Sequence, residues 1–184
     1  MKVGVLALQG AVEPHLEMFR RLGQPCLAVR QPADLEEIDR IILPGGESTT
    51  MLSLLERSEL LAPLAEFGRS HPVWGICAGA ILIAREVEHP RQRSLGLINI
   101  LARRNHYGSQ LDSFKTPVQV ASLAEPIEAD FIRAPLLSPL SASVRVLAEH
   151  GGAPVLMQEG RILASSFHTE LGTNPRLHAL FLSL

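Results

Sequence analysis

The chain has 184 residues, of which 46% are hydrophobic and 20% charged, with a formal net charge of −2. These values are typical of a compact globular protein, and we expect a single domain over residues 1–184. Since no basic excess is present, we expect no nucleic-acid partner. No apolar run approaches the roughly 18 residues that span a bilayer, and the N-terminal run predicts a strand and not a signal peptide. We therefore expect a cytoplasmic protein without a membrane partner.

The first half of the chain alternates between short apolar runs and segments of helical periodicity. Apolar runs predict strands at 2–8, 26–30, 40–46 and 72–77. Helical segments are predicted at 11–22, 33–38, 48–67 and 78–87, the third with Ser48 as its N-cap. This alternation predicts an α/β fold in three layers, with a mostly parallel central sheet and helices on both faces.

The second half is richer in strands and ends in a helical pattern. Strand-like pieces are predicted at 95–105, 116–123, 128–135, 144–150 and 153–168, and a terminal helix at 175–184. In a parallel sheet, binding sites lie beyond the carboxyl ends of the strands. Three loops of the first half fall there: Gln9-Gly10, Gly45-Gly46-Glu47 and Ile76-Cys77-Ala78.

The stretch GICAGA places Cys77 between Gly75 and Gly79. This is the thiol form of a nucleophile elbow, in which small neighbours give clearance at a sharp strand-to-helix turn. A lone free cysteine is more often a small buried apolar residue, but the elbow context favours a nucleophile. The other cysteine, Cys26, lacks such a context and is expected in the core.

A nucleophilic thiol needs a base, and the base needs a group that orients it. Of seven histidines, only His168 has a carboxylate placed for this, because Glu170 lies two residues further along an extended stretch. A histidine two residues before a glutamate is by itself weak evidence for catalysis, because most such pairs lie at the solvent-exposed end of a strand. The prediction of a catalytic role for His168 and Glu170 is stronger here because the pair follows an apolar run, at the end of a second predicted strand.

The stretch LPGGESTT forms a third element of the predicted site. The backbone N–H groups of Gly46 and Ala78 could together form an oxyanion hole. Phosphate binding at the start of the next helix is a weaker alternative, because no nucleotide-binding pattern accompanies it. A second alternative is that this stretch has only a structural role, as a turn followed by the cap of the next helix.

Taken together, these motifs resemble the class I (triad) glutamine amidotransferases, whose fold is flavodoxin-like. More narrowly, the chain is similar to the glutaminase subunits of pyridoxal 5′-phosphate synthases. The resemblance extends along the whole chain through GVLALQGAVEPH, LPGGESTTM, GICAGA, RNHYGSQLDSF, FIRAP and SFHTEL.

The resemblance implies a cysteine-dependent hydrolysis of L-glutamine to L-glutamate and ammonia. Cys77 would be the nucleophile, His168 the acid and base, and Glu170 the group that orients His168. By the same resemblance, six residues would contact glutamine: Gly46, Glu47, Ser48, Arg104, Ile132 and Arg133.

The resemblance also implies a partner, a synthase subunit of the lyase/synthase barrel kind that takes up the ammonia. Gln9 and Gly10 are candidates for an activation switch, because glycine tolerates both signs of φ. We expect no cofactor and no metal. The alternatives are a glutaminase subunit of another biosynthetic amidotransferase, a related cysteine hydrolase or chaperone, and an inactive binding module of the same fold.

Several positions depart from the family pattern, among them Tyr107, where phenylalanine is usual, and Ala80, where leucine is common. Thr169 stands where proline is common between the histidine and the glutamate, and Ser109 where arginine is common. None of these changes removes a catalytic group, so we expect the triad to be retained.

Overall fold

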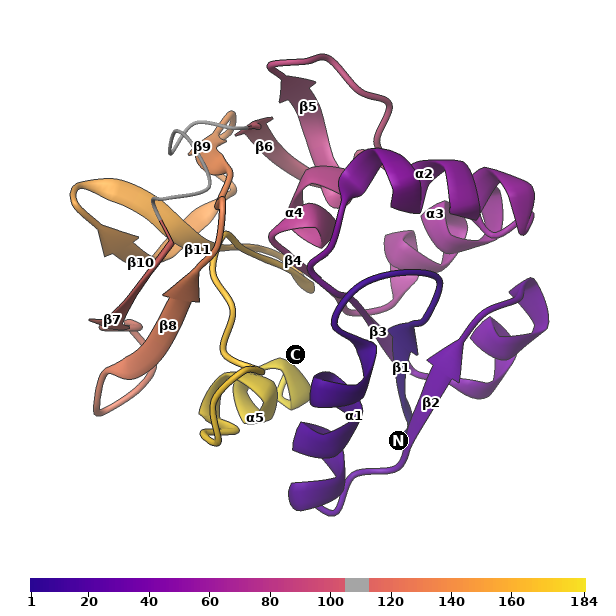
Figure 1. Cartoon of the computed structure of the whole chain (residues 1–184), viewed down its shortest axis with the longest axis horizontal. Coiled ribbons are helices and arrows are strands. Elements are labelled where there is room, and N and C mark those ends of the chain that lie inside the picture. The colour runs from indigo at the N-terminus through magenta and orange to yellow at the C-terminus, as the bar shows by residue number, and fades with distance from the viewer. Residues whose placement is uncertain (105–112) are drawn as a thin grey trace.

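The computed structural model describes residues 1–104 and 113–184, and a central sheet runs through it (Figure 1). Seven strands form this sheet in the order β10-β11-β12-β4-β3-β1-β2. Five of them run parallel: β1 (Val3–Leu6), β2 (Cys26–Val29), β3 (Arg40–Leu43), β4 (Val73–Ile76) and β12 (Ile162–Ser165). The antiparallel β11 (Ala153–Glu159) and β10 (Arg145–His150) extend one edge. The predicted mostly parallel sheet is confirmed.

Helices cover both faces of the sheet, as predicted. One face packs against α2 (Ser48–Arg57), α3 (Leu61–Ser70) and α4 (Ala78–Ile83), and the other against α1 (Val12–Arg21) and α5 (Arg176–Leu182). In β3, Ile41 and Leu43 join the first core while Ile42 joins the second, and all three are fully buried. Because successive side chains of a strand point to opposite faces, a strand between two helical layers is apolar throughout.

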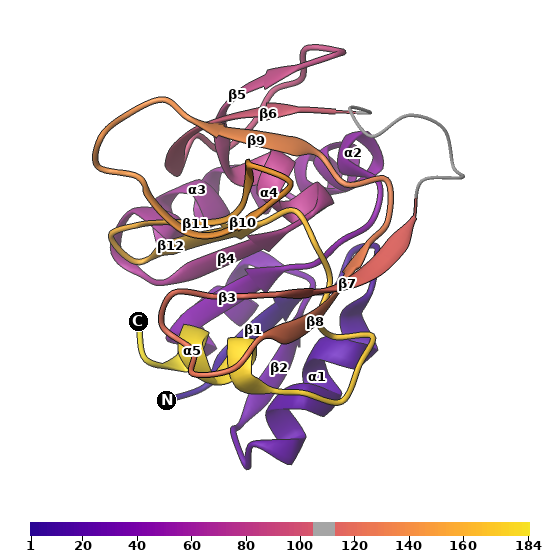
Figure 2. The same cartoon turned by 90° about the vertical axis from the view of Figure 1, so that its left-hand side faces the viewer.

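Two small sheets and a 3₁₀ helix, η1 (Pro32–Glu37), complete the described fold. β5 (Ala84–Glu88), β6 (Ile98–Arg103) and β9 (Leu136–Pro139) form one sheet, and β7 (Phe114–Val118) pairs with β8 (Ile127–Phe131). Figure 2 shows the three-stranded sheet above the central sheet and α1 and α5 below it. The side chains of Val118, Ile127 and Phe131 belong to the same core as α1 and α5.

The helix predicted at 48–67 is wrong as a single element. The chain turns after α2, where Glu59 has a φ of 59° and the N–H of Leu60 donates to the carbonyl of Leu55. This geometry is typical of a helix C-terminus. Pro63 then lies in the first turn of α3, a position at which proline leaves no helical hydrogen bond unmade.

Three further expectations are also wrong. The predicted helix at 78–87 ends at Ile83, because the chain from Ala84 onward pairs with β6 and forms β5. Ser48 is not the N-cap of α2; Glu47 is, and its carboxylate accepts hydrogen bonds from the backbone N–H groups of Thr49 and Thr50. Cys26, expected in the core, is only partly buried beside it.

Candidate active site

Cys77 lies on a sharp turn between β4 and α4. Its φ of 49° and ψ of −103° are unusual for a residue with a side chain and cost about 1–3 kcal/mol. A Cβ atom on Gly75 would lie 2.6 Å from the carbonyl oxygen of Gly79, and one on Gly79 would lie 2.0 Å from that of Leu43. The turn therefore requires glycine on both sides of the cysteine.

His168 is brought to Cys77 by the central sheet. β12 pairs with β4 in parallel, and Ser165 lies opposite Ile76, so both chains leave the sheet at the same edge. The backbone of His168 is then fixed by a bridge to Asp130 at the end of β8, with N–H to carbonyl distances of 2.8 and 2.9 Å. This bridge connects the β7–β8 ribbon directly to the site.

Glu170 lies behind His168 and is fully buried. Its Oε1 is 2.6 Å from His168 Nδ1, and its Oε2 accepts a hydrogen bond from the backbone N–H of Thr169 at 3.0 Å. The period-two spacing predicted from the sequence thus places both side chains together. Threonine at position 169 leaves this contact intact and supplies one of its donors.

The two side chains have shifted pKa values of opposite sense. Burial lowers the pKa of His168, but hydrogen bonds with the Cys77 and Glu170 side chains and the charge of Glu170 outweigh it and raise this pKa to about 10. Burial raises the pKa of Glu170, but the hydrogen bond to His168 and the nearby charges outweigh it and lower this pKa to about 2. At neutral pH the pair is an imidazolium and a carboxylate.

Cys77 and His168 open onto a cavity of about 500 Å³, a size suited to a small molecule. Every residue predicted for the site lines this cavity except Glu170. Besides Cys77 and His168, these lining residues are Gln9, Gly10, Gly46, Glu47, Ser48, Ala78, Arg104, Ile132 and Arg133. Arg133 has a φ of 45° at the turn that follows β8. The structure therefore brings together residues from six separate loops.

The first glycine of the Pro-Gly-Gly turn also has a specific place in the site. A Cβ atom on Gly45 would lie 2.2 Å from Cε1 of His168, so this glycine makes room for the imidazole ring. A Cβ atom on Gly46 would lie 2.4 Å from the side-chain oxygen of Gln9. That oxygen accepts a hydrogen bond from the backbone N–H of Glu47 at 2.9 Å.

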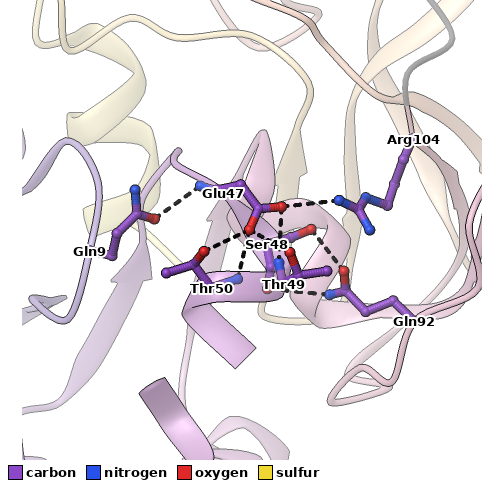
Figure 3. Close-up of polar contacts among 7 residues, drawn as sticks. All are labelled: Gln9, Glu47, Ser48, Thr49, Thr50, Gln92 and Arg104. Atoms are coloured by element: carbon purple, nitrogen blue, oxygen red, sulfur yellow. Dashed lines mark hydrogen bonds and ion pairs between the residues drawn. The ribbon is translucent and has the colours of Figure 1, made fainter. Parts of the chain in front are cut away.

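Glu47 is the centre of a polar cluster at the start of α2 (Figure 3). Its carboxylate accepts hydrogen bonds from the backbone N–H and hydroxyl groups of Thr49 and Thr50, and from Arg104 Nη2 at 3.1 Å. Burial raises the pKa of Glu47, but the hydrogen bonds from Thr49 and Thr50 outweigh it and lower the pKa to about 2. The other terminal nitrogen of Arg104, Nη1, is buried and has no hydrogen-bond partner among the described residues.

Sequence reasoning missed Gln92 and gave His15 no role. The side-chain oxygen of Gln92 accepts a hydrogen bond from the Ser48 hydroxyl at 2.9 Å, and so attaches the segment after β5 to α2. His15 Nε2 lies 3.6 Å from Glu170 Oε1. Neither residue has a chemical motif of its own. Ser109 and most of its sequence block lie outside the described residues.

Comparison with solved structures identifies the class of protein. A crystal structure described as a glutamine amidotransferase superposes with a TM-score of 0.92 and 41% identity, and the match covers 98% of this chain and 97% of that one. A structure of PurLQS from Thermotoga maritima, at 15% identity and a TM-score of 0.77, shares the fold. The chain has the glutamine amidotransferase fold.

The family follows from the sequence comparisons. The model of the SNO glutamine amidotransferase family matches residues 5–184, and the chain belongs to this family. Similar proteins include the pyridoxal 5′-phosphate synthase subunit PdxT of Deinococcus radiodurans, 47% identical over 100% of this chain and 97% of its own length. The protein of the same name from Thermotoga neapolitana is 43% identical over 100% of this chain and 99% of its own length.

Within residues 1–104 and 113–184, the structure contains no helix that is both long and apolar enough to cross a membrane.

Proposed function

We propose that this chain hydrolyses L-glutamine to L-glutamate and ammonia through a thioester on Cys77. One observation carries the proposal: a strained cysteine and a buried His168–Glu170 pair meet at the same cavity. The proton that His168 holds at neutral pH is available to a departing ammonia.

In the proposed reaction, Cys77 attacks the side-chain amide carbon of glutamine as a thiolate, its proton having passed to His168. The backbone N–H groups of Gly46 and Ala78 stabilise the oxyanion of the tetrahedral intermediate. His168 transfers its proton to the leaving nitrogen, ammonia departs and a thioester remains. A water molecule then attacks the thioester while His168 takes up one of its protons, and glutamate leaves as the Cys77 thiolate and the His168 imidazolium re-form. Glu170 holds His168 in the required orientation throughout.

Glutamine is proposed to bind with its carboxylate toward Arg104, whose Nη1 has no partner among residues 1–104 and 113–184 and can donate to it. Gly46, Glu47 and Ser48 would contact the substrate from one wall of the cavity, and Ile132 and Arg133 from the other. All six residues line the same cavity, which supports this assignment.

We further propose that the ammonia passes to a pyridoxal 5′-phosphate synthase subunit of the lyase/synthase barrel kind, in the cytoplasm. Relatives that match over nearly their whole length carry the name of a subunit of that synthase, which supports this pathway over another amidotransferase. Two exposed apolar side chains on the cavity lining, Ile132 and Leu171, are available for such a partner.

The test is glutamate release from glutamine by the purified chain, alone and mixed with the synthase subunit from the same source. We expect strong stimulation by that subunit, no activity in Cys77→Ala, and full activity in Cys26→Ala, which removes the other free cysteine. Activity that survives Cys77→Ala would exclude a thiol mechanism. High activity without stimulation would instead indicate a different amidotransferase pathway.

A further inference from the structure

Two further buried histidines contact each other, and one of them lies close to Glu170. His15 is on α1 and His178 on α5, helices that lie side by side in Figures 1 and 2. Both rings are fully buried, and His15 Nδ1 is 2.9 Å from His178 Nε2. His15 Nε2 is 3.6 Å from Glu170 Oε1. A continuous line of imidazole and carboxylate groups therefore runs from His178 to the cavity.

Neither histidine carries a charge at neutral pH. Burial lowers the pKa of His15 to about 4, although the charge of Glu170 opposes this effect. Burial and the neighbouring His15 lower the pKa of His178 to about 3. Each ring therefore has one N–H group, and the 2.9 Å contact requires one of the two rings to donate and the other to accept.

The Glu170 carboxylate decides which ring donates. If His15 Nδ1 carried the hydrogen, the lone pair of its Nε2 would point at the anionic Oε1 of Glu170, and His178 Nδ1–H would have no acceptor among the described residues. In the opposite arrangement His178 Nε2–H donates to His15 Nδ1, and His15 Nε2–H faces the carboxylate. Only the second arrangement places a positive end of a dipole against the negative charge.

We propose that His15 and His178 are positioning residues for the triad, both with hydrogen on Nε2, and that they hold the Glu170 carboxylate toward His168. Oε2 of Glu170 is fixed by the backbone N–H of Thr169, whereas Oε1 lies between His168 and His15. Two hydrogen bonds, with His168 and with Thr169, thus hold the carboxylate, and His15 Nε2 faces Oε1 from 3.6 Å, too far for a hydrogen bond. This role rests on the proposed glutaminase function, but the tautomer assignment does not.

The surroundings keep the histidine pair dry and in place. Trp74 lies at a steep angle to both rings, with ring centroids 6.1 Å from His15 and 5.0 Å from His178, and Phe19 packs at a steep angle against His178 at 5.3 Å. The indole N–H of Trp74 is engaged with the Ser165 hydroxyl at 3.0 Å and does not compete for either ring. In such a dry site an N–H directed at a carboxylate acts more strongly than in water.

The tautomers are tested by NMR of protein labelled with ¹⁵N in its histidines, with variants at positions 15 and 178 to assign the signals. We expect both rings to remain neutral, with hydrogen on Nε2, between about pH 5.5 and 8, where ordinary histidines titrate. Hydrogen on Nδ1 of either ring, or protonation in that range, would overturn the proposal. This measurement is independent of enzyme activity.

The positioning role is tested by paired substitutions in the complex with the synthase subunit. We expect His178→Leu to lower kcat/KM for glutamine about tenfold, the effect of one lost hydrogen bond in a chain that ends on a charge. His178→Gln should retain most of the wild-type kcat/KM, because the Nε2 of a glutamine side chain can donate a hydrogen bond from the position of the imidazole Nε2. His15→Leu and His15→Gln should behave in the same way.

Phe19→Leu is the matched control, since it removes packing against His178 without removing a donor. Equal losses in the leucine and glutamine variants, or an equal loss in Phe19→Leu, would mean that the histidines only fill space. An inactive wild-type complex would refute the proposed function instead, and the NMR result would still decide the tautomers.

Discussion

At the scale of single residues, Arg104 is the proposed substrate ligand whose surroundings the structure defines best. Its Nη2 is held by Glu47, its side chain is only 13% exposed, and its Nη1 has no hydrogen-bond partner among the residues described. An arginine fixed in this way presents a second donor at a set position. A lysine can keep the charge but offers no second nitrogen in the same plane.

We therefore expect Arg104→Lys to raise the KM for glutamine about tenfold while kcat changes much less. Steady-state kinetics of the complex with the synthase subunit measure both constants. Arg103→Lys is the matched control, because its neighbour Arg103 pairs with Glu88 and does not line the cavity. An unchanged KM in Arg104→Lys would show that this arginine does not bind the substrate.

The proposed catalytic residues could be predicted from the sequence because a short local motif indicates the chemistry of each. Cys77 between two glycines and a histidine two positions before a glutamate both have local signatures. His15 and His178 are 163 positions apart and meet only because α1 and α5 pack side by side. Gln92 and Ser48 are likewise 44 positions apart. Contacts of this kind depend on tertiary structure, which no local pattern encodes.

At the scale of elements, the alternation of strands and helices was predictable, and the errors have specific causes. The run from Ala78 to Val87 is apolar enough for a helix or a strand, and pairing with β6 decides its second half. The 48–67 segment keeps helical periodicity across its break. Pro63 was the available sign that a new helix begins, because proline is favoured in a first turn.

The loop between β1 and α1 lies directly against the Pro-Gly-Gly turn. Gly10 has a φ of 104°, and a Cβ atom there would lie 2.0 Å from the carbonyl oxygen of Gly45. That carbonyl accepts a hydrogen bond from the N–H of Ala11 at 3.1 Å. Any side chain at position 10 must therefore displace the turn that contains Gly46, whose N–H we assign to the oxyanion hole.

We expect Gly10→Ala to abolish most of the stimulation of glutaminase activity by the synthase subunit, with a smaller effect on folding. Gly23→Ala is the control, because Gly23 also has a positive φ of 66° but no atom lies within 4 Å of a Cβ built there. Gly23→Ala carries only a backbone penalty of about 1 kcal/mol, whereas Gly10→Ala must in addition displace the turn, so we expect the lower melting temperature in Gly10→Ala. Full stimulation of Gly10→Ala would rule out the switch.

At the scale of the whole molecule, the site depends on the order of the strands. Cys77 and His168 come from opposite halves of the chain, and they meet because β12 inserts beside β4 in the sheet. The sequence indicated that both residues follow strands, but not that those strands are neighbours. The organisation of residues 1–184 as one domain stays a prediction.

The buried titratable groups also determine how the stability of the whole molecule depends on pH. His15 and His178 have pKa values of about 4 and 3 in the folded state, against 6.5 for an ordinary histidine. Between these values the unfolded chain binds more protons, so the free energy of unfolding falls as the pH is lowered from about 6.5. Glu170, with its pKa lowered from 4.5 to about 2, adds to the loss below pH 4.5.

His168 acts in the opposite direction. Its pKa is raised to about 10, so the folded state binds the additional proton between pH 6.5 and 10, and its contribution to stability is lost as the pH rises through that range. Since the histidine pair destabilises the fold on the acid side and His168 on the alkaline side, these groups together place the maximum of stability near pH 6.5.

The acid side of this profile can be assigned by urea unfolding between pH 6.5 and 4.5, above the range in which Glu170 contributes most. We expect His178→Leu to reduce the pH dependence of the free energy of unfolding by about 1 kcal/mol per pH unit, because a fully buried neutral histidine contributes up to about 1.4. Phe19→Leu, which alters packing in the same core, should lower the stability without changing this slope. If His178→Leu kept the wild-type slope, His178 would already be protonated in the folded state, and the neutral pair near Glu170 would not exist.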